Sequence, residues 1–387
     1  MIDPATYRAS ELLAKSMSPH WRIAQTHNLD HFERAGFPVR ISSVREIGPI
    51  VDSMQENRFD SYMQELDGLT KEEHALALAG CRDAVRFQLA FLPHRPPVLP
   101  LSTLFSVLVL YKKLRGIRPD FRTLLEIGPG CGYLSFVLRH HSALESYSQI
   151  EACESFYILQ NLVNLHCFGH LCDDRALPHE NTQAIDVFAA EGPVLEFSNK
   201  LQLSGINPRS THYPWWRLGE IISHQRQFDI VSSNANLLEF NRTALDDYLS
   251  LIQRVMSPEG ALLVQCTGYP AQGNDESLLK TMHDKGFAPL LFVQPNKPAK
   301  CPVIGGDNIS RAVDQGTLPQ VTFNVTNALF IKSGHPLFAT YYDKRNFHLH
   351  FIAPEPIVVR TYFDRPAGRS YYTAQHFAEE VERSLEE

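Results

Sequence analysis

The chain has 387 residues, of which 44% are apolar, and its 36 basic and 43 acidic residues give a formal net charge of −7. This length and apolar content suffice for one large domain, or for a catalytic domain with additions, around a sizeable core. No long run of Lys or Arg is present, which argues against a nucleic-acid partner and favours a small-molecule substrate.

The cysteines and the apolar stretches indicate a protein of a reducing compartment. The seven cysteines are scattered and odd in number, which is typical of reduced thiols and not of a disulfide framework. The start, Met1 to Pro4, lacks the basic and then apolar pattern of a signal peptide. The most apolar stretch, Val98 to Tyr111, is too short to span a bilayer. We therefore expect a cytoplasmic protein with no membrane partner, and a homodimer stays open.

The first hundred residues have the pattern of a helical region. Apolar residues recur at helical spacing from Ala5 to Ser16, with Asp3 placed as N-cap and Pro4 as the first helical residue. The same spacing returns between Phe59 and Phe91. Prolines then break the pattern, and a further helix is predicted over Leu101 to Arg115.

From Thr123 onward, predicted strands alternate with predicted helices, which is the order of a doubly wound α/β sheet. The predicted strands cover 123–127, 148–152, 228–232, 261–266, 290–293 and 328–331, and the helices cover 133–141, 155–165, 242–256 and 276–285. The last two strands are expected to pair as in a hairpin. The stretch from Phe168 to about Glu220 gives no clear assignment.

Gly128, Gly130 and Gly132 directly follow the first strand and directly precede a helix. Glycine permits left-handed turns and the close approach of a ligand, and α/β sheets bind nucleotides at this position. The spacing is Gly-x-Gly-x-Gly, whereas a dinucleotide-binding fingerprint would have a third glycine where Tyr133 stands. The alternative is a turn that merely joins strand to helix.

Glu151 ends the second predicted strand, about twenty residues after the glycines, at the spacing expected of a carboxylate that accepts hydrogen bonds from ribose hydroxyls. Glu154 competes for this role. A solvated carboxylate at a strand end is the alternative interpretation.

Leu125 to Gly132 resembles motif I of the class I S-adenosylmethionine-dependent methyltransferases. Phe228 to Asn234 is similar to their fourth-strand motif, Pro258 to Val264 to their turn and fifth strand, and Gly286-Phe287 to their ending. The resemblance spans about 101 to 332 and implies a mostly parallel, seven-stranded, Rossmann-like sheet that binds S-adenosyl-L-methionine (SAM). It implies these cofactor-binding residues: Glu126, Gly128, Pro129, Gly130, Gly132, Tyr133, Glu151 and Asn234.

A narrower resemblance is to sugar O-methyltransferases, which have a helical N-terminal region and an Asn-x-x-x-x-Glu-Met-like run after the fourth strand. That run is Asn234 to Phe240 here, with Phe240 in place of Met, and Cys131 departs from the small residue usual in motif I. The resemblance implies methyl transfer to a hydroxyl of a sugar or another small metabolite. The expected division is a helical region 1–100, a catalytic domain 101–335 and a C-terminal extension 336–387.

A hydroxyl acceptor must lose a proton, so the reaction needs a general base or a metal. His212 and Glu239 are the base candidates, because imidazole titrates near neutral pH and Glu239 follows the fourth-strand motif. Asn236 is a candidate for acceptor binding, and Trp215 and Trp216 are candidates for stacking on a sugar ring. The alternatives are helix capping for the asparagine, and core packing for the tryptophans and His212.

One short segment contains four residues of types that can bind zinc, namely His166, Cys167, His170 and Cys172. Their spacing does not match that of a structural zinc site, so no metal site is predicted. Three other functions stay open: an N-methyltransferase, an inactive methyltransferase-like scaffold and a nicotinamide dehydrogenase. Asn234 to Leu237 lacks both prolines of an Asn-Pro-Pro-Tyr-like motif, which disfavours a nitrogen acceptor.

Overall fold

A computed structural model describes residues 3–17, 38–53, 57–176, 208–224, 226–234, 236–237, 240, 242–265, 278–293, 327–336, 338–341 and 368–386. Within these ranges, no helix combines the length and the apolar character needed to cross a membrane.

The fold is built on one eight-stranded sheet in the order β3-β4-β2-β1-β5-β6-β8-β7. β1 (Thr123–Ile127) is central and pairs in parallel with β2 (Ser146–Glu151) and β5 (Phe228–Asn234). The parallel part extends to β3, β4 and β6, and β8 and β7 close one edge in antiparallel pairs. The bounds of the other strands are β3 (Cys172–Asp174), β4 (Ser210–Pro214), β6 (Met256–Gln265), β7 (Phe287–Val293) and β8 (Asn327–Lys332).

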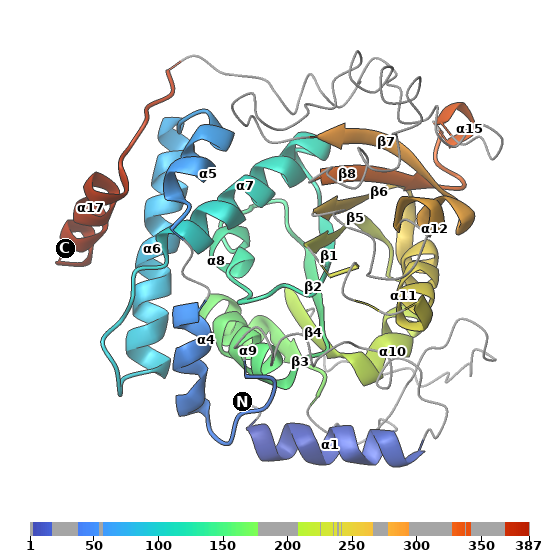
Figure 1. Cartoon of the computed structure of the whole chain (residues 1–387), viewed down its shortest axis with the longest axis horizontal. Helices are drawn as coiled ribbons and strands as arrows, with labels where there is room; N and C mark the ends of the chain where they lie inside the picture. Colours follow the sequence, from blue (N-terminus) through green and yellow to red (C-terminus); the bar gives the residue numbers. More distant parts are fainter. Residues whose placement is uncertain are drawn as a thin grey trace, which may run out of the picture.

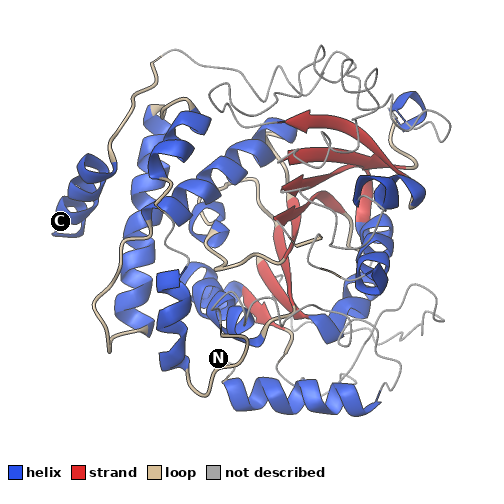
Figure 2. Ribbon diagram, viewed as in Figure 1, coloured by secondary structure: helices blue, strands red, loops and turns tan. Residues whose placement is uncertain are grey.

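Helices cover both faces of the sheet (Figures 1 and 2). One face carries α7 (Leu101–Ile117), α8 (Leu134–Leu138) and α9 (Glu154–Phe168), and the other carries α10 (Leu218–Ser223), α11 (Arg242–Val255) and α12 (Leu278–Asp284). This cover buries β1 on both sides, which explains why it is mainly apolar, with Glu126 as its one charged residue. The predicted doubly wound α/β fold is confirmed.

The strand order reverses at β1, because the chain runs to β2 on one side and to β5 on the other. Ile127, the last residue of β1, pairs with Ile150 of β2 and Ser233 of β5, so three strands end at nearly the same level. In open α/β sheets, ligands bind outside the carboxyl ends of the strands at such a switch point. The topology therefore places the glycine turn at the expected binding edge.

Further helices form a layer outside this unit. They are α1 (Pro4–Met17), η1 (Val44–Ile47), α4 (Gly48–Ser53), α5 (Phe59–Leu66), α6 (Lys71–Phe91) and α17 (Ala374–Glu386). α17 lies against α6 although the two are far apart in the sequence (Figure 1). The remaining short helices are η2 (Gly169–Leu171), η3 (Trp215–Arg217) and α15 (Phe338–Tyr341).

The structure differs from the sequence-based assignment mainly between β2 and β5. The sheet has eight strands where seven were expected, and β3 and β4 lie in the stretch that had no assignment. β3 is three residues long and includes two aspartates, so it lacks the apolar run that marks a buried strand. The helical pattern predicted between residues 59 and 91 corresponds to two helices, α5 and α6. They are separate because Asp67, which has a left-handed φ of 59°, ends α5.

Candidate functional site

The glycine turn, residues 128–132, joins β1 to α8. Gly128, Gly130 and Gly132 have φ values of 62°, 60° and 73°, in the left-handed region that residues with a Cβ rarely enter. The Gly128 amide donates to the Ile150 carbonyl at 2.9 Å, which ties the turn to β2. The three glycines are therefore required by the backbone path at the end of the central strand.

Asn236, two residues beyond β5, braces this turn from the neighbouring strand. Its Nδ2 donates to the carbonyls of Ile127 at 2.7 Å, Gly128 at 3.0 Å and Asn234 at 2.6 Å. A Cβ on Gly128 would lie 2.0 Å from Asn236 Oδ1. Asn236 was expected to bind the acceptor, but its amide holds the turn, because the switch point brings β1 and β5 together. Asn234, an expected cofactor residue, is exposed at the end of β5.

Two other expected cofactor residues support the turn. The Pro129 carbonyl accepts a hydrogen bond from the Gly132 amide at 3.0 Å. Tyr133 is buried at the start of α8, and its hydroxyl has no hydrogen-bond partner among the described residues. Pro129 thus acts through its backbone, and the ring of Tyr133 belongs to the core.

Glu151 ends β2 with its carboxylate largely buried beside the turn. Its Oε1 accepts hydrogen bonds from the amides of Ala152 and Cys153, both at 2.8 Å, and its Oε2 accepts one from Gln160 Nε2 at 2.8 Å. Burial raises the pKa of Glu151, and these hydrogen bonds oppose the shift. A carboxylate has about four acceptor positions. Three of these positions on Glu151 accept hydrogen bonds from the protein, so one position is left for a ligand hydroxyl. The sequence analysis expected hydrogen bonds from both ribose hydroxyls.

Gln160, on α9, was missed by the sequence analysis. Its Nε2 donates to the Gly130 carbonyl at 2.7 Å as well as to Glu151, and its Oε1 faces His212 Nε2 at 2.8 Å. It also lies under Gly132, where a Cβ would be 3.0 Å from Gln160 Cγ. One buried amide thus joins the turn, the β2 carboxylate and β4. A glutamine inside a helix that is buried on nearly all sides carries no sequence signal for such a role.

Glu126 lies just before the turn, and its carboxyl is buried. Its Oε2 accepts a hydrogen bond from the Tyr147 hydroxyl, whose oxygen accepts one from Gln149 Nε2 at 2.6 Å. Burial is the main cause that raises the pKa of Glu126 to about 7; the Glu151 carboxylate adds to the shift and the hydrogen bond from Tyr147 opposes it. A cation bound beside Glu126 would favour its ionised form.

The raised pKa of Glu126 predicts that stability falls as pH rises. The folded carboxyl keeps its proton up to about pH 7, whereas the unfolded one loses it near pH 4.5, so the stabilisation is complete below 4.5 and lost through about 7. Glu126→Gln, which is neutral throughout, should flatten this dependence by up to about 1.4 kcal/mol per pH unit. Urea unfolding between pH 5 and 8 measures the slope. Parallel curves for wild type and variant would contradict the assignment.

His212 lies in the middle of β4 and is fully buried. Its Nε2 faces Gln160 Oε1 at 2.8 Å, its Nδ1 faces Asn161 Oδ1 at 2.9 Å, and its ring stacks on Tyr157 with the centroids 3.9 Å apart. Burial lowers the pKa of His212 to about 3. These contacts do not support the expected role as general base, because both ring nitrogens face protein amides. They favour the alternative of a hydrogen-bonded core histidine.

Trp215 and Trp216 follow β4 in η3 and are 2% and 0% exposed. Trp215 Nε1 donates to Glu11 Oε1 at 3.3 Å, and Trp216 packs edge-on against Tyr7 with the ring centroids 4.8 Å apart. Both partners belong to α1, so the N-terminal helix covers the tryptophans. Stacking on a substrate needs an exposed ring face, and the structure instead favours core packing for both residues.

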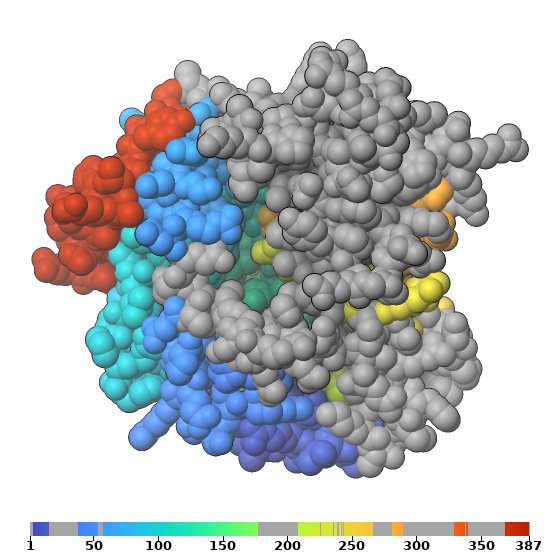
Figure 3. Space-filling model, in the orientation of Figure 1, coloured from blue at the N-terminus to red at the C-terminus, as the bar shows by residue number. Residues whose placement is uncertain are grey.

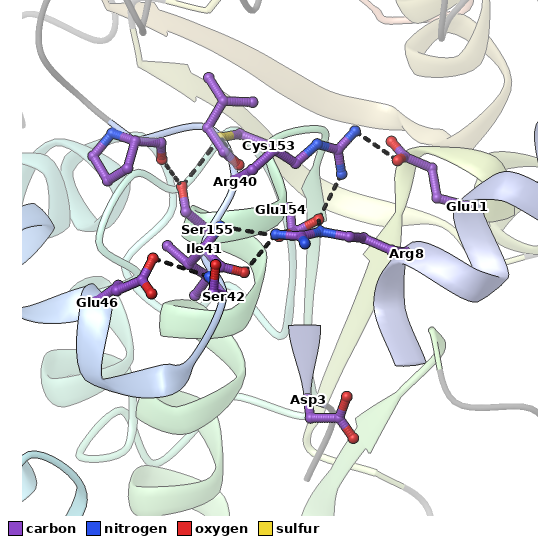
Figure 4. Close-up of polar contacts among 12 residues, drawn as sticks. Asp3, Arg8, Glu11, Arg40, Ile41, Ser42, Glu46, Cys153, Glu154 and Ser155 are labelled. Carbon is purple, nitrogen blue, oxygen red and sulfur yellow. Dashed lines mark hydrogen bonds and ion pairs between the residues drawn. The ribbon is translucent and has the colours of Figure 1, made fainter. Parts of the chain in front are cut away.

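Glu154 anchors the N-terminal segment next to this site (Figure 4). Its side chain is fully buried and forms ion pairs with Arg8 of α1 at 2.8 Å and with Arg40 at 2.6 Å. Arg40 also pairs with Glu11 at 2.6 Å, and the Ile41 amide donates to Glu154 at 3.2 Å. Glu154 therefore has a structural role, which leaves Glu151 as the carboxylate that faces the turn.

The other candidates add no further group to the site. Glu239 lies outside the described residues. No group of three or more metal-ligating side chains is found within the described ranges. His166, considered above with the cysteines, packs its ring against Phe87 and Phe136 instead.

The described site lies at the carboxyl ends of β1 and β2 and consists of the glycine turn and two nearby buried carboxyl groups, those of Glu126 and Glu151. Neither Glu126 nor Glu151 has a basic side chain as partner within the described ranges. In the space-filling view, teal and green atoms, which belong to the part of the chain before about residue 175, are visible near the centre of the face that the figure shows (Figure 3). Such a site can bind a hydroxyl-bearing ligand with positive charge.

No family model matches the chain, and no curated protein matches it at a significant level. Similar solved structures include the methyltransferase domain of bacterial CtHen1, with 9% identity over 58% of this chain and 95% of that chain and a TM-score of 0.32. MtNAS in complex with MTA and tNA has 15% identity over 80% and 96% of the chains and a TM-score of 0.34. The O-methyltransferase TomG from Streptomyces achromogenes, in complex with SAM, has 15% identity over 72% and 97% and a TM-score of 0.29. Likenesses this weak carry no argument about function, which depends on the site itself.

Proposed function

We propose that the chain is a SAM-dependent methyltransferase that transfers a methyl group to a hydroxyl of a sugar or another small metabolite. The observation that carries the proposal is the pair of buried carboxyls at the glycine turn, Glu126 on β1 and Glu151 on β2. Buried carboxylates without basic partners are costly, and a ligand that brings positive charge compensates them. SAM carries a sulfonium and an ammonium group and two ribose hydroxyls.

A dinucleotide fits this site less well. Its diphosphate would add negative charge between Glu126 and Glu151, and it is normally bound by free amides at a helix N-terminus. α8, which follows the turn, is only five residues long, and Tyr133 stands where the dinucleotide fingerprint has glycine. The charge of the site thus favours a cationic nucleoside over a nicotinamide cofactor.

The chain would act mainly by positioning and by excluding water. Methyl transfer is an in-line displacement in which the cofactor brings its own leaving group. Glu151 would accept a hydrogen bond from one ribose hydroxyl, and Glu126 would favour the ammonium group. A hydroxyl acceptor needs a general base, and Glu239, which follows β5 in the sequence, stays the predicted base. The assignment of a sugar as the acceptor depends on the resemblance of the run from Asn234 to Phe240 to the sugar O-methyltransferases.

Titration calorimetry of the full chain with SAM, S-adenosylhomocysteine (SAH) and NAD tests the proposal. We expect micromolar binding of SAM and SAH, about −8 kcal/mol, and none of NAD. Absence of SAM binding at millimolar concentration would favour the inactive scaffold, and NAD binding would favour the dehydrogenase. Methyl transfer from labelled SAM to paired hydroxyl and amine compounds then separates O- from N-methylation.

Glu151→Gln is expected to weaken SAM binding by about tenfold to a hundredfold, because it removes a charged acceptor for a ribose hydroxyl. Its stability should change little, since the amide oxygen can still accept the two backbone hydrogen bonds. Glu154→Gln is the control, three residues away and also buried, and should lower stability while SAM affinity stays near normal. Normal affinity in Glu151→Gln would remove the ribose role.

A further inference from the structure

A polar network lies between the sheet and the helices α8 and α9, and it ends on the Glu126 carboxyl. Alternate residues of a strand point to the same face of a sheet, so Tyr147 and Gln149 of β2 share a face. Glu126 of β1 is the register partner of Gln149. We name this set the Tyr147 network, and its members in order are Ser135, Asn164, Gln149, Tyr147 and Glu126.

The hydrogen bonds of the Tyr147 network all run toward Glu126. Ser135 Oγ donates to Asn164 Oδ1 at 2.8 Å, and Asn164 Nδ2 donates to Gln149 Oε1. Gln149 Nε2 donates to the Tyr147 hydroxyl oxygen at 2.6 Å, and this hydroxyl donates to Glu126 Oε2. The four donors are fully buried, so water does not compete for these bonds. Because each bond polarises the next donor, the network strengthens the last bond, which ends on the carboxyl.

Tyr147 distinguishes the two carboxyl oxygens of Glu126. The Tyr147 hydroxyl has one hydrogen, and Oε2 of Glu126 accepts it, while Gln149 donates to the hydroxyl oxygen. Burial and the nearby Glu126 raise the pKa of Tyr147, so the hydroxyl keeps its hydrogen. The other carboxyl oxygen, Oε1, has no hydrogen-bond partner among the described residues and is not fully enclosed.

We propose that Tyr147 is the positioning residue of Glu126: its hydroxyl, held by Gln149, keeps Oε2 turned to the protein and leaves Oε1 for the ammonium group of the cofactor. The consequence for ligand binding rests on the proposed function, whereas the hold of Tyr147 on Glu126 does not. Since the hydrogen bond from Tyr147 favours the ionised carboxyl, Tyr147 also sets the pH at which Glu126 can bind a cation.

The surroundings of Glu126 leave Tyr147 as the main polar group that acts on it. The titratable groups that influence its pKa are the Tyr147 hydroxyl, which lowers it, and the Glu151 carboxyl, which raises it; both belong to β2. The neighbouring residues of α8 and α9 in the network are uncharged, and so is Ser232, the register partner of Glu126 on β5.

Tyr147→Phe tests the proposal by the pH dependence of SAH binding to the full chain. The affinity of wild type should rise by up to about tenfold per pH unit below about pH 7 and level off above it, because the ammonium group favours the ionised Glu126. Loss of the hydroxyl removes a hydrogen bond to a charged group and should move this midpoint up by about one pH unit. At pH 6, the variant should therefore bind SAH at least about tenfold more weakly. Titration calorimetry between pH 5.5 and 8.5 measures the profile.

Tyr157→Phe is the matched control. Tyr157 is also fully buried, and its hydroxyl also donates to a carboxylate, at 2.7 Å from Asp174 Oδ1. This variant should lose stability but keep the wild-type midpoint for SAH binding. A second control places Tyr147→Phe in the Glu126→Gln background, where residue 126 does not titrate, and there the change should leave the pH profile in place.

An unchanged midpoint in Tyr147→Phe would overturn the proposal, and so would a shift that persists in the Glu126→Gln background. If wild type itself does not bind SAH, the proposed function fails, and urea unfolding then decides whether Tyr147 holds Glu126. The ratio of the unfolding constants of Tyr147→Phe and wild type should grow about fivefold between pH 6 and pH 8, and it should stay constant in the Glu126→Gln background. A constant ratio in both backgrounds would refute the hold.

Discussion

Gly128→Ala is expected to abolish cofactor binding and to destabilise the fold by about 3–5 kcal/mol. The left-handed φ of 62° costs a residue with a Cβ about 1–2 kcal/mol. The new methyl group would also lie 2.0 Å from Asn236 Oδ1 and 2.2 Å from its Cγ. Asn236 can move only by giving up its hydrogen bonds to Ile127, Gly128 and Asn234. Urea unfolding and SAH titration measure the two effects.

Gly169 provides a matched control for this substitution. It also has a left-handed φ, 55°, but a Cβ there would meet nothing within 4 Å. Gly169→Ala should therefore cost only the backbone strain and leave SAH binding unchanged. The double variant Gly128→Ala/Asn236→Ala removes the clash between the new methyl group and the Asn236 side chain but keeps the backbone strain at residue 128. Comparison with the two single variants therefore gives the coupling energy between positions 128 and 236. Equal behaviour of the two alanine variants would show that Asn236 does not brace the turn.

Trp216→Ala should destabilise the chain by about 3–5 kcal/mol, which is the usual cost of truncating a large buried aromatic residue. The ring is fully buried, packs on Tyr7 of α1 and lies at 89° to the ring of Trp215. The loss should appear in urea unfolding, with SAH affinity preserved under conditions where the variant is folded.

Tyr7→Phe serves as the companion variant for Trp216→Ala. The Tyr7 hydroxyl is buried with no hydrogen-bond partner among the described residues, so its removal should be neutral or stabilising. A Trp216→Ala protein with normal stability but impaired turnover would instead restore the substrate-stacking role.

The sequence was sufficient to predict the central part of the fold. β1 covers the predicted residues 123–127, because a short, mainly apolar run that is ended by glycines leaves little choice other than a strand buried on both faces. The glycine turn, Glu151 at the end of β2 and the antiparallel last pair were also placed by local patterns. These features share a strong local signal, in which strand, turn and helix follow one another within a few residues.

Contacts between distant segments could not be predicted from the sequence. Asp174 and His212 are neighbours because β3 pairs with β4, two strands separated by a long stretch of chain and with weak strand patterns of their own. Gln160 reads as an ordinary helix residue until α9 is placed against β2 and β4.

The role of Glu154 also depended on a distant contact. From the spacing, Glu151 was the predicted ribose residue and Glu154 its competitor, and the approach of Arg8 and Arg40 from the N-terminal segment gives Glu154 its structural role. The same holds for Trp215 and Trp216, whose burial depends on α1.

The anchoring of the N-terminal segment at Glu154 bears on how the protein can be shortened for experiments. A fragment beginning at residue 101, the expected start of the catalytic part, would lack both arginines and leave a buried carboxylate uncompensated at the first turn of α9. It would also uncover Trp216 and Tyr157, which α1 shields through Tyr7. Recombinant work on the isolated sheet unit should therefore retain the first helix and the stretch through Ile41.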